Sequence, residues 1–226
     1  MLLTGFGRRE WGIATVVAIA IGVPCSLLGW WWVWIPLGLG WITVAGFFRD
    51  PLGRRPESTN ALDLVSPADG RISAIERVDA HDATDGEPAI VVRIFLSVLD
   101  VHLNRAPADV TVRWIRHRPG RYLDARTEES AKVNESNLIA LQTRDGRFLG
   151  VRQVSGAIAR RIVCPIGEGE TLERGARFGM IKFGSTTELV VPADDATRVK
   201  VEVGDRVVGG VTILVCLSEP GTPGES

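Results

Sequence analysis

The first feature of the chain is a long stretch without charge, from residue 11 to residue 48. Its 38 residues are too many for one membrane crossing and about enough for two. Each half would be roughly 28 Å long as a helix, which is close to the thickness of a bilayer core. Pro24, Ser26 and Gly29 stand near the midpoint and favour a turn there. The pattern therefore predicts that residues 1–49 form a helical hairpin that holds the protein at a membrane.

Arginines flank this stretch on both sides. Arg8 and Arg9 precede it, and Arg49, Arg54 and Arg55 follow it, which places both ends in the cytoplasm. Six of the seven tryptophans lie in the stretch, as is typical of an aromatic belt at a membrane interface. A secretory signal peptide is disfavoured because the apolar run is too long and arginines continue beyond it. A hairpin that dips into the bilayer without crossing it fits the same pattern.

Beyond a polar linker over residues 50–60, apolar residues come in short runs separated by turn residues, which is typical of β-strands. The candidate strands are Leu62–Val65, Arg71–Val78, Ala89–Ser97, Val110–Ile115, Leu138–Thr143, Phe148–Val154, Arg161–Cys164, Phe178–Phe183, Thr187–Val191, Arg198–Val201 and Val211–Leu217. Helical periodicity is weak and is confined to Gly156–Arg161 and Leu123–Val133. We expect a mostly antiparallel β sandwich or barrel over residues 61–218, with residues 219–226 as a flexible tail.

Two segments repeat one pattern 35 residues apart: Glu168–Gly175 and Val203–Gly210. Each has glycines six residues apart, an acidic residue after the first glycine, and an apolar run afterwards. Together with Ser66–Ile72 they resemble the turns of lipoyl- and biotinyl-type domains, which are barrel-sandwich hybrids. Lys182 lacks the residues that flank a modified lysine in such domains, so we interpret it as an ordinary strand residue. A membrane-tethered carrier or interaction module without catalysis is nevertheless the non-enzymatic alternative.

Composition narrows the classes of function. The formal net charge of −1 gives no general attraction for nucleic acid, so we expect no nucleic-acid partner. Cys25, Cys164 and Cys216 are odd in number and far apart, which favours neither a disulfide framework nor a zinc site. A reducing environment for the β domain is the simplest fit, and no metal is expected.

Three short motifs carry groups that could act together. Asp69 lies in Ser-Pro-Ala-Asp-Gly, where an aspartate is usually a turn residue, and His102 follows an apolar run, where a histidine is usually structural. Ser185 follows Gly184 between two apolar runs, and such a pair is usually an ordinary turn. A glycine nevertheless has no Cβ to shield its carbonyl and tolerates a strained turn, so the serine hydroxyl can attack it. The bond between Gly184 and Ser185 is therefore a candidate site of self-cleavage.

In this order, the motifs resemble those of the phosphatidylserine decarboxylases, particularly their short bacterial and archaeal forms. The shared motifs are Ser-Pro-Ala-Asp-Gly at 66–70, Asp-Val-His-Leu-Asn-Arg-Ala-Pro at 100–107, Asn-Glu at 134–135 and Gly-Met-Ile-Lys-Phe-Gly-Ser-Thr at 179–186. Three positions depart from the family pattern. Phe183 replaces a commoner leucine, Arg105 stands where long-form members have a second histidine, and Ser136 stands where an arginine is commoner. We assign no charged role to the Asn-Glu motif.

The resemblance implies a self-processing enzyme. His102, oriented by Asp69, would take the proton of Ser185, whose oxygen would attack the carbonyl of Gly184 and form an ester. Elimination would then divide the chain, and residue 185 would become a pyruvoyl group that acts as the electron sink in decarboxylation. His102 would also be the general acid of turnover. Whether this histidine serves both steps is open.

The implied reaction converts phosphatidylserine into phosphatidylethanolamine and CO₂ during phospholipid biosynthesis. The expected partners are phosphatidylserine in the membrane and the enzyme's own cleaved chains, residues 1–184 and 185–226, with a homo-oligomer also compatible. The expected location is the cell membrane, with the catalytic domain facing the cytoplasm. An archaetidylserine-type lipid fits the same motifs.

Overall fold

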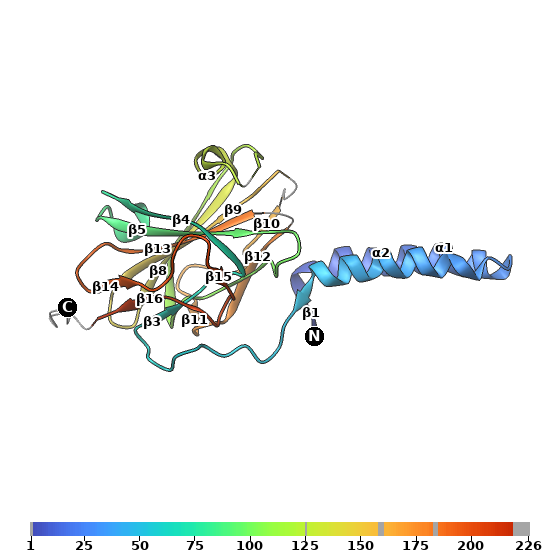
Figure 1. Ribbon diagram of the computed structural model, residues 1–226, viewed down its shortest axis with the longest axis horizontal. Coiled ribbons are helices and arrows are strands. Elements are labelled where there is room, and N and C mark those ends of the chain that lie inside the picture. Colours follow the sequence, from blue (N-terminus) through green and yellow to red (C-terminus); the bar gives the residue numbers. More distant parts are fainter. Residues whose placement is uncertain (1, 125, 158–160, 183–184, 219–226) are drawn as a thin grey trace. The chain divides into compact units, whose positions relative to one another are not determined.

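The computed structural model describes residues 2–124, 126–157, 161–182 and 185–218, and it divides into two compact units, Met1–Gly53 and Arg54–Ser226 (Figure 1). The α-helices are α1 (Arg8–Leu27), α2 (Trp34–Phe47) and α3 (Glu128–Val133), and the 3₁₀ helices are η1 (Gly5–Gly7), η2 (Trp31–Val33) and η3 (Asp82–Thr84). The strands are β1 (Leu2–Leu3), β2 (Arg49–Asp50), β3 (Asp63–Val65), β4 (Gly70–Val78), β5 (Ala89–Leu96), β6 (Leu103–Arg105), β7 (Val110–Arg118), β8 (Ser136–Thr143), β9 (Phe148–Val154), β10 (Arg161–Val163), β11 (Thr171–Leu172), β12 (Arg177–Lys182), β13 (Ser185–Pro192), β14 (Thr197–Val199), β15 (Arg206–Val207) and β16 (Ile213–Leu217).

The first unit is the expected pair of apolar helices, and its two ends meet in the small sheet formed by β1 and β2. The two arms differ in length. The segment Gly5–Leu27 is long and apolar enough to cross a membrane. The second segment, Trp31–Phe47, is shorter and begins with the 3₁₀ helix η2 after a turn at Leu28 and Gly29. Large apolar side chains of both helices are exposed, and water is a poor solvent for such a surface. The unit therefore fits a membrane better than water.

Small and polar residues hold the two helices together. Gly22 lets them approach closely, because a Cβ at this position would lie 2.5 Å from the ring of Trp34. The indole N–H of Trp34 donates to Ser26 Oγ, and that of Trp41 donates to Thr15 Oγ1, both at 2.8 Å. The indole N–H groups are thus hydrogen-bonded to hydroxyls of the other helix without water, as a hydrocarbon environment requires.

The second unit is a curled antiparallel β structure, as the sequence predicts. Its largest sheet has eight strands in the order β11-β7-β8-β9-β13-β5-β4-β15 (Figure 1). Two sheets of three strands, β10-β12-β6 and β14-β16-β3, complete the unit, and all ladders between named strands are antiparallel. Apolar side chains from all three sheets form one buried core, which includes Ile94, Leu189, Phe178 and Leu214. Side chains alternate along β13, so Leu189 faces this core while Val190 belongs to a separate cluster on the other face.

The repeated glycine segments form matching turns. Gly169 and Gly175 have φ angles of 81° and 80°, and Gly204 and Gly210 have φ angles of 102° and 74°. Residues with a Cβ rarely adopt these angles, so the repeat reflects a shared backbone requirement. The turns contain β11 and β15, which lie at the two opposite edges of the eight-stranded sheet.

The remaining differences from the expected elements are local. Every expected strand run contains a strand, but the short strands β6, β11 and β15 have too few residues to show an alternating pattern. Within Leu123–Val133, the part that is helical is Glu128–Val133, which begins where the Thr127 hydroxyl accepts a hydrogen bond from the Ser130 N–H. The expected helix Gly156–Arg161 is wrong at its end, because Arg161 begins β10, and residues 158–160 lie outside the described part.

Candidate active site

The predicted cleavage site lies where the chain passes from one sheet to another. Strand β12 ends at Lys182 in a three-stranded sheet, and β13 begins at Ser185 in the eight-stranded sheet. Gly184, the other side of the predicted bond, lies outside the described residues. The two strands belong to different sheets, so they do not pair with each other as a hairpin.

Ser185 is fully buried at the first position of β13. It pairs with Leu96, the last residue of β5, and by alternation its side chain lies on the same face of the sheet as Thr187 and Leu189. Among the residues that the structure describes, its Oγ has no hydrogen-bond partner. Most buried hydroxyls are hydrogen-bonded, so an unsatisfied one needs an explanation, and a reactive role is one such explanation.

His102 is also fully buried, directly before β6. Its carbonyl oxygen accepts a hydrogen bond from the N–H of Ile181 at 3.2 Å, which brings it beside the end of β12, four residues before Ser185. The ring Nδ1 lies 3.0 Å from the carbonyl oxygen of Asp100. A carbonyl can only accept, so Nδ1 carries the hydrogen and the neutral ring has its lone pair on Nε2. The imidazole is therefore held in one tautomer, with Nε2 able to act as a base.

Asp69 lies directly before Gly70, which packs closely against the end of β5 next to Ser185. Gly70 has a φ of 155°, and a Cβ there would lie 2.2 Å from the carbonyl oxygen of Phe95, so a larger residue would push β4 away from β5. Phe95 precedes Leu96, the partner of Ser185. The segments that carry Asp69 and Ser185 therefore flank the same end of β5, on its two sides.

The hydrogen bonds of Asp69 differ from those we expected. Both of its carboxylate oxygens accept from the guanidinium of Arg54, with 2.7 Å between Nη2 and Oδ2, and Oδ1 also accepts from the N–H of Gly209 at 2.9 Å. Arg54 Nη1 in turn donates to the carbonyl oxygen of Gly209 at 2.7 Å. In the described part of the chain, His102 is not a hydrogen-bond partner of Asp69. The feature that holds the histidine ring is the Asp100 carbonyl oxygen.

Arg54 is a partner of the candidate residue Asp69 that the sequence did not reveal. It lies in the segment expected to be a linker, yet both it and Asp69 are largely shielded from water, and a two-pronged arginine–carboxylate pair of this kind is strong and directional. The only sign in the sequence was an arginine in a run rich in proline and glycine. This arginine is already explained as one of the positive charges that flank the apolar stretch.

A buried polar network connects the strands that carry His102 and Ser185. Asn104 Nδ2 donates to Thr187 Oγ1 at 2.9 Å, and Gln153 Nε2 donates to Asn104 Oδ1 at 2.8 Å. Asn137 Nδ2 extends the network to Gln153 Oε1 at 3.2 Å. Asn104 lies two residues after His102 and Thr187 two residues after Ser185, so the network fixes the registers of β6, which follows His102, and of β13, which begins at Ser185. Gln153 and Thr187, polar residues within predicted strands, were the available signal, whereas Asn104 and Asn137 lie outside the predicted strands.

The motif Asn-Glu has a structural role. The Asn134 amide donates to the carbonyl oxygens of Leu123 and Ser155 at 2.9 and 2.8 Å, and its Oδ1 accepts from the Leu123 N–H at 2.8 Å. Glu135 pairs with His117 at 2.9 Å. These contacts tie the α3 segment to the end of β9.

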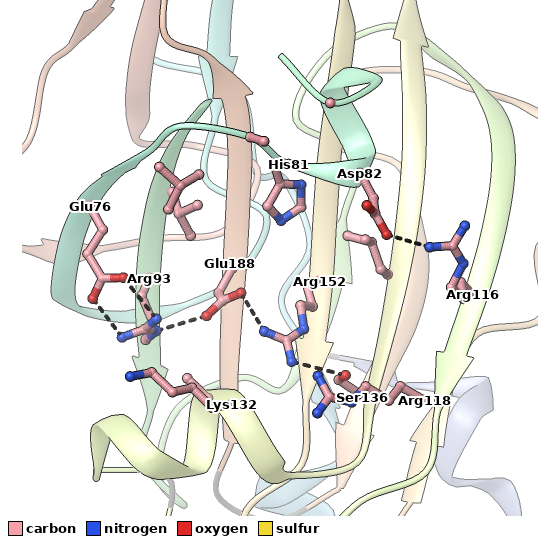
Figure 2. A pocket seen from close by; sticks show the side chains of 16 residues that line it. Glu76, His81, Asp82, Arg93, Arg116, Arg118, Lys132, Ser136, Arg152 and Glu188 are labelled. Atoms are coloured by element: carbon pink, nitrogen blue, oxygen red, sulfur yellow. Dashed lines mark hydrogen bonds and ion pairs between the residues drawn. The ribbon is translucent and has the colours of Figure 1, made fainter. Parts of the chain in front are cut away.

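A cavity of about 670 Å³ lies on the face of the eight-stranded sheet opposite to the one that carries the Ser185 side chain (Figure 2). A chain of ion pairs and hydrogen bonds crosses it: Arg93 donates to Glu188 at 2.9 Å and to Glu76 at 3.2 Å, while Arg152 reaches Glu188 and Ser136 at 3.2 Å each. Burial lowers the pKa of Arg93, but the two carboxylates outweigh it and raise that pKa overall. Glu188 is three residues from Ser185 and therefore points to the other face of β13. This cavity is not where Ser185 lies.

His81 lines the same cavity and is half-buried. Its Nδ1 accepts a hydrogen bond from the N–H of Ala83 at 3.1 Å, which begins η3. Burial lowers its pKa, and the nearby Glu188 and Asp82 offset this only in part. The ring is therefore neutral at pH 7 and caps a turn.

The described residues contain no group of three or more histidine, cysteine, aspartate or glutamate side chains that could hold a metal ion. Burial raises the pKa of Cys164 and of Cys216 to about 11, so both remain thiols at neutral pH and are poor nucleophiles.

Known proteins match the chain over most of its length. The family model described as phosphatidylserine decarboxylase matches residues 42–215. A phosphatidylserine decarboxylase proenzyme of Rhodopirellula baltica is 41% identical over 213 residues, covering 92% of this chain and 85% of the relative. Proenzymes of the same name from Ralstonia nicotianae and Aromatoleum aromaticum are each 40% identical, with 92% of this chain and 93% of each relative covered. The chain therefore belongs to the phosphatidylserine decarboxylase family.

Proposed function

We propose that this protein is a self-processing, pyruvoyl-dependent decarboxylase that converts phosphatidylserine into phosphatidylethanolamine and CO₂. The observation that carries the proposal is Ser185: a fully buried hydroxyl without a hydrogen-bond partner among the described residues, directly after a glycine, at a junction between sheets. The relatives' name, proenzyme, supports a precursor that must be processed. An unsatisfied serine at this position has no use in a carrier module.

The cleavage that we propose uses the chain's own groups. His102 Nε2 takes the hydroxyl proton of Ser185 while the serine oxygen attacks the carbonyl carbon of Gly184. The peptide bond between Gly184 and Ser185 then breaks, the released nitrogen is protonated, and an ester forms. Loss of the α-proton of residue 185 then expels the Gly184 carboxylate and leaves dehydroalanine. Its imine tautomer takes up water and releases ammonia, which leaves a pyruvoyl group at the start of the small chain. The fixed tautomer of His102 supports its role as base, because Nδ1 donates to the Asp100 carbonyl oxygen and the lone pair of the neutral ring is then on Nε2.

In turnover, the pyruvoyl group supplies an electron sink for the electrons that remain when CO₂ leaves the serine headgroup. His102 is the proposed general acid that delivers a proton to the substrate carbon. Asp69 remains our proposed orienting partner of His102. To bind the histidine ring, its carboxylate would have to give up its hydrogen bonds with Arg54. Until then the Arg54–Asp69 pair holds the Gly209 segment against the site.

Intact mass and denaturing electrophoresis of the purified protein test the proposal. We expect two chains, residues 1–184 and a small chain of 42 residues, 185–226, whose mass is lower by one ammonia than that of the same peptide beginning with serine. Vesicles of phosphatidylserine should yield phosphatidylethanolamine. A carrier or interaction module would remain one chain and leave the lipid unchanged, and that result would contradict the proposal.

We also propose that the first unit anchors the enzyme in the cell membrane with the β unit in the cytoplasm. The pairing of β1 with β2 supports both ends of the hairpin being on one side, and arginines at both ends favour the cytoplasmic side. In sealed cells, a thiol reagent that cannot cross membranes should miss cysteines introduced at Leu2 and Thr59. Labelling of either would overturn this orientation. A cysteine at Leu28, in the turn, should be labelled from outside if the hairpin spans and missed if it only dips.

A further inference from the structure

The turn that follows β5 exposes two aliphatic side chains. Val98 is 48% exposed and Leu99 is 80% exposed, although Leu96 before them and Val101 after them are buried. The chain therefore leaves the core at Leu96, presents two aliphatic groups to the exterior, and returns to the core within five residues. Exposed aliphatic residues are common singly, so their significance depends on how the turn is held and where it lies.

The turn is firmly held, so its exposure does not reflect a loose loop. The N–H of Ser97 donates to Asp100 Oδ2 at 2.9 Å, and the N–H of Asp100 donates back to the carbonyl oxygen of Ser97 at 2.9 Å. Asp100 Oδ1 also pairs with Arg206 at 3.3 Å. This ion pair neutralises the single carboxylate of the turn, so its tip offers a neutral, apolar surface.

The turn is also placed at the candidate active site. Its first flank, Leu96, is the strand partner of Ser185, and its other flank leads directly into His102, whose ring is held by Asp100. Val208, two residues beyond the Arg206 that pairs with the turn, is another exposed aliphatic residue, at 37%. Apolar and neutral groups therefore border the segments that carry both reactive side chains.

We propose that the turn 97–100 is a membrane-contact element that inserts Val98 and Leu99 among the lipids and sets the depth at which a phospholipid headgroup meets residue 185. This inference rests on the proposed function, because a lipid substrate stays in the bilayer while Ser185 is fully buried in the protein. The headgroup can reach such a residue only if the surrounding surface lies at the interface. Aliphatic side chains gain free energy when they leave water for that region, and a neutralised turn avoids the cost of inserting a charge.

The test is a comparison of two substrates in the full-length protein. We expect Leu99→Asp, and more mildly Leu99→Ser, to lower decarboxylation of phosphatidylserine in vesicles, by about tenfold for the aspartate. Self-cleavage should be unchanged, and so should turnover of a short-chain phosphatidylserine kept below its critical micelle concentration. Arg144→Asp and Arg144→Ser are the controls. Arg144 is exposed in the turn that joins β8 and β9, at the end of these strands remote from Ser185. Both controls should retain full activity on vesicles.

Each other outcome overturns the proposal in a recognisable way. Equal losses on vesicles and on the soluble lipid would mean that the turn acts only by holding His102. Full vesicle activity in both Leu99 variants would mean that the turn does not enter the membrane, and loss of self-cleavage in both would assign it to folding. Failure of the unmodified protein to cleave itself or to decarboxylate the soluble lipid would instead overturn the proposed function.

Discussion

Ser185→Ala is expected to leave the protein as one chain of 226 residues without decarboxylase activity. The variant loses the oxygen that attacks the preceding carbonyl, and without cleavage no pyruvoyl group forms. Folding should be preserved or slightly improved, because Oγ is buried without a hydrogen-bond partner in the described structure and alanine removes that unsatisfied group. Denaturing electrophoresis, intact mass and a thermal unfolding curve measure these three effects.

The neighbouring threonine provides a matched control. Thr186 Oγ1 is likewise buried without a partner among the described residues, but by alternation its side chain points to the other face of β13. Thr186→Val keeps the shape of the side chain and removes the hydroxyl, so self-cleavage should continue at the unmodified rate. If the Ser185 variant were cut at the same bond, the intramolecular mechanism would be wrong. If the Thr186 variant also stayed intact, the effect would lie in the packing of the strand and not in the nucleophile.

His102→Ala is expected to slow self-cleavage by about 10²–10⁴-fold, the usual effect of losing a general acid or base. The substitution removes the Nε2 lone pair that we propose receives the serine proton. His117→Ala is the matched control, because His117 is exposed and its one described ion pair joins it to Glu135 on the surface. That control should cleave at close to the unmodified rate. The measurement is the fraction of cleaved chain against time after synthesis.

The same variant separates the two roles of the histidine. Chains of His102→Ala that cleave slowly can be purified after long incubation, and their turnover of phosphatidylserine can then be compared with that of the unmodified mature enzyme. We expect a second loss of about 10²–10⁴-fold, since protonation of the substrate carbon also needs an acid. Turnover at the unmodified rate would show that His102 serves maturation alone and that the proton comes from water or another residue.

The sequence by itself determined most elements of this protein and supplied the candidates for its reactive residues. An uncharged run of 38 residues allows little besides an apolar helix pair, and alternating runs separated by glycine turns lead to an antiparallel β unit. Such patterns are local, because the period of a helix or strand shows within a few turns of the chain. The candidates Ser185, His102 and Asp69 come from short motifs, which are local in the same way.

The tertiary structure alone decided which groups these residues meet. Arg54 in a segment that reads as a linker takes the carboxylate of Asp69, and the carbonyl oxygen of Asp100 holds the His102 ring. These partners depend on strand register and on how separate sheets pack, which no local period encodes. The same holds for the exposed turn at Leu99. In the sequence, Val98 and Leu99 continue the apolar run of the strand, but β5 ends at Leu96, and both side chains are exposed. Side-chain partners far apart in the chain are set by packing, and packing is decided by the whole fold at once.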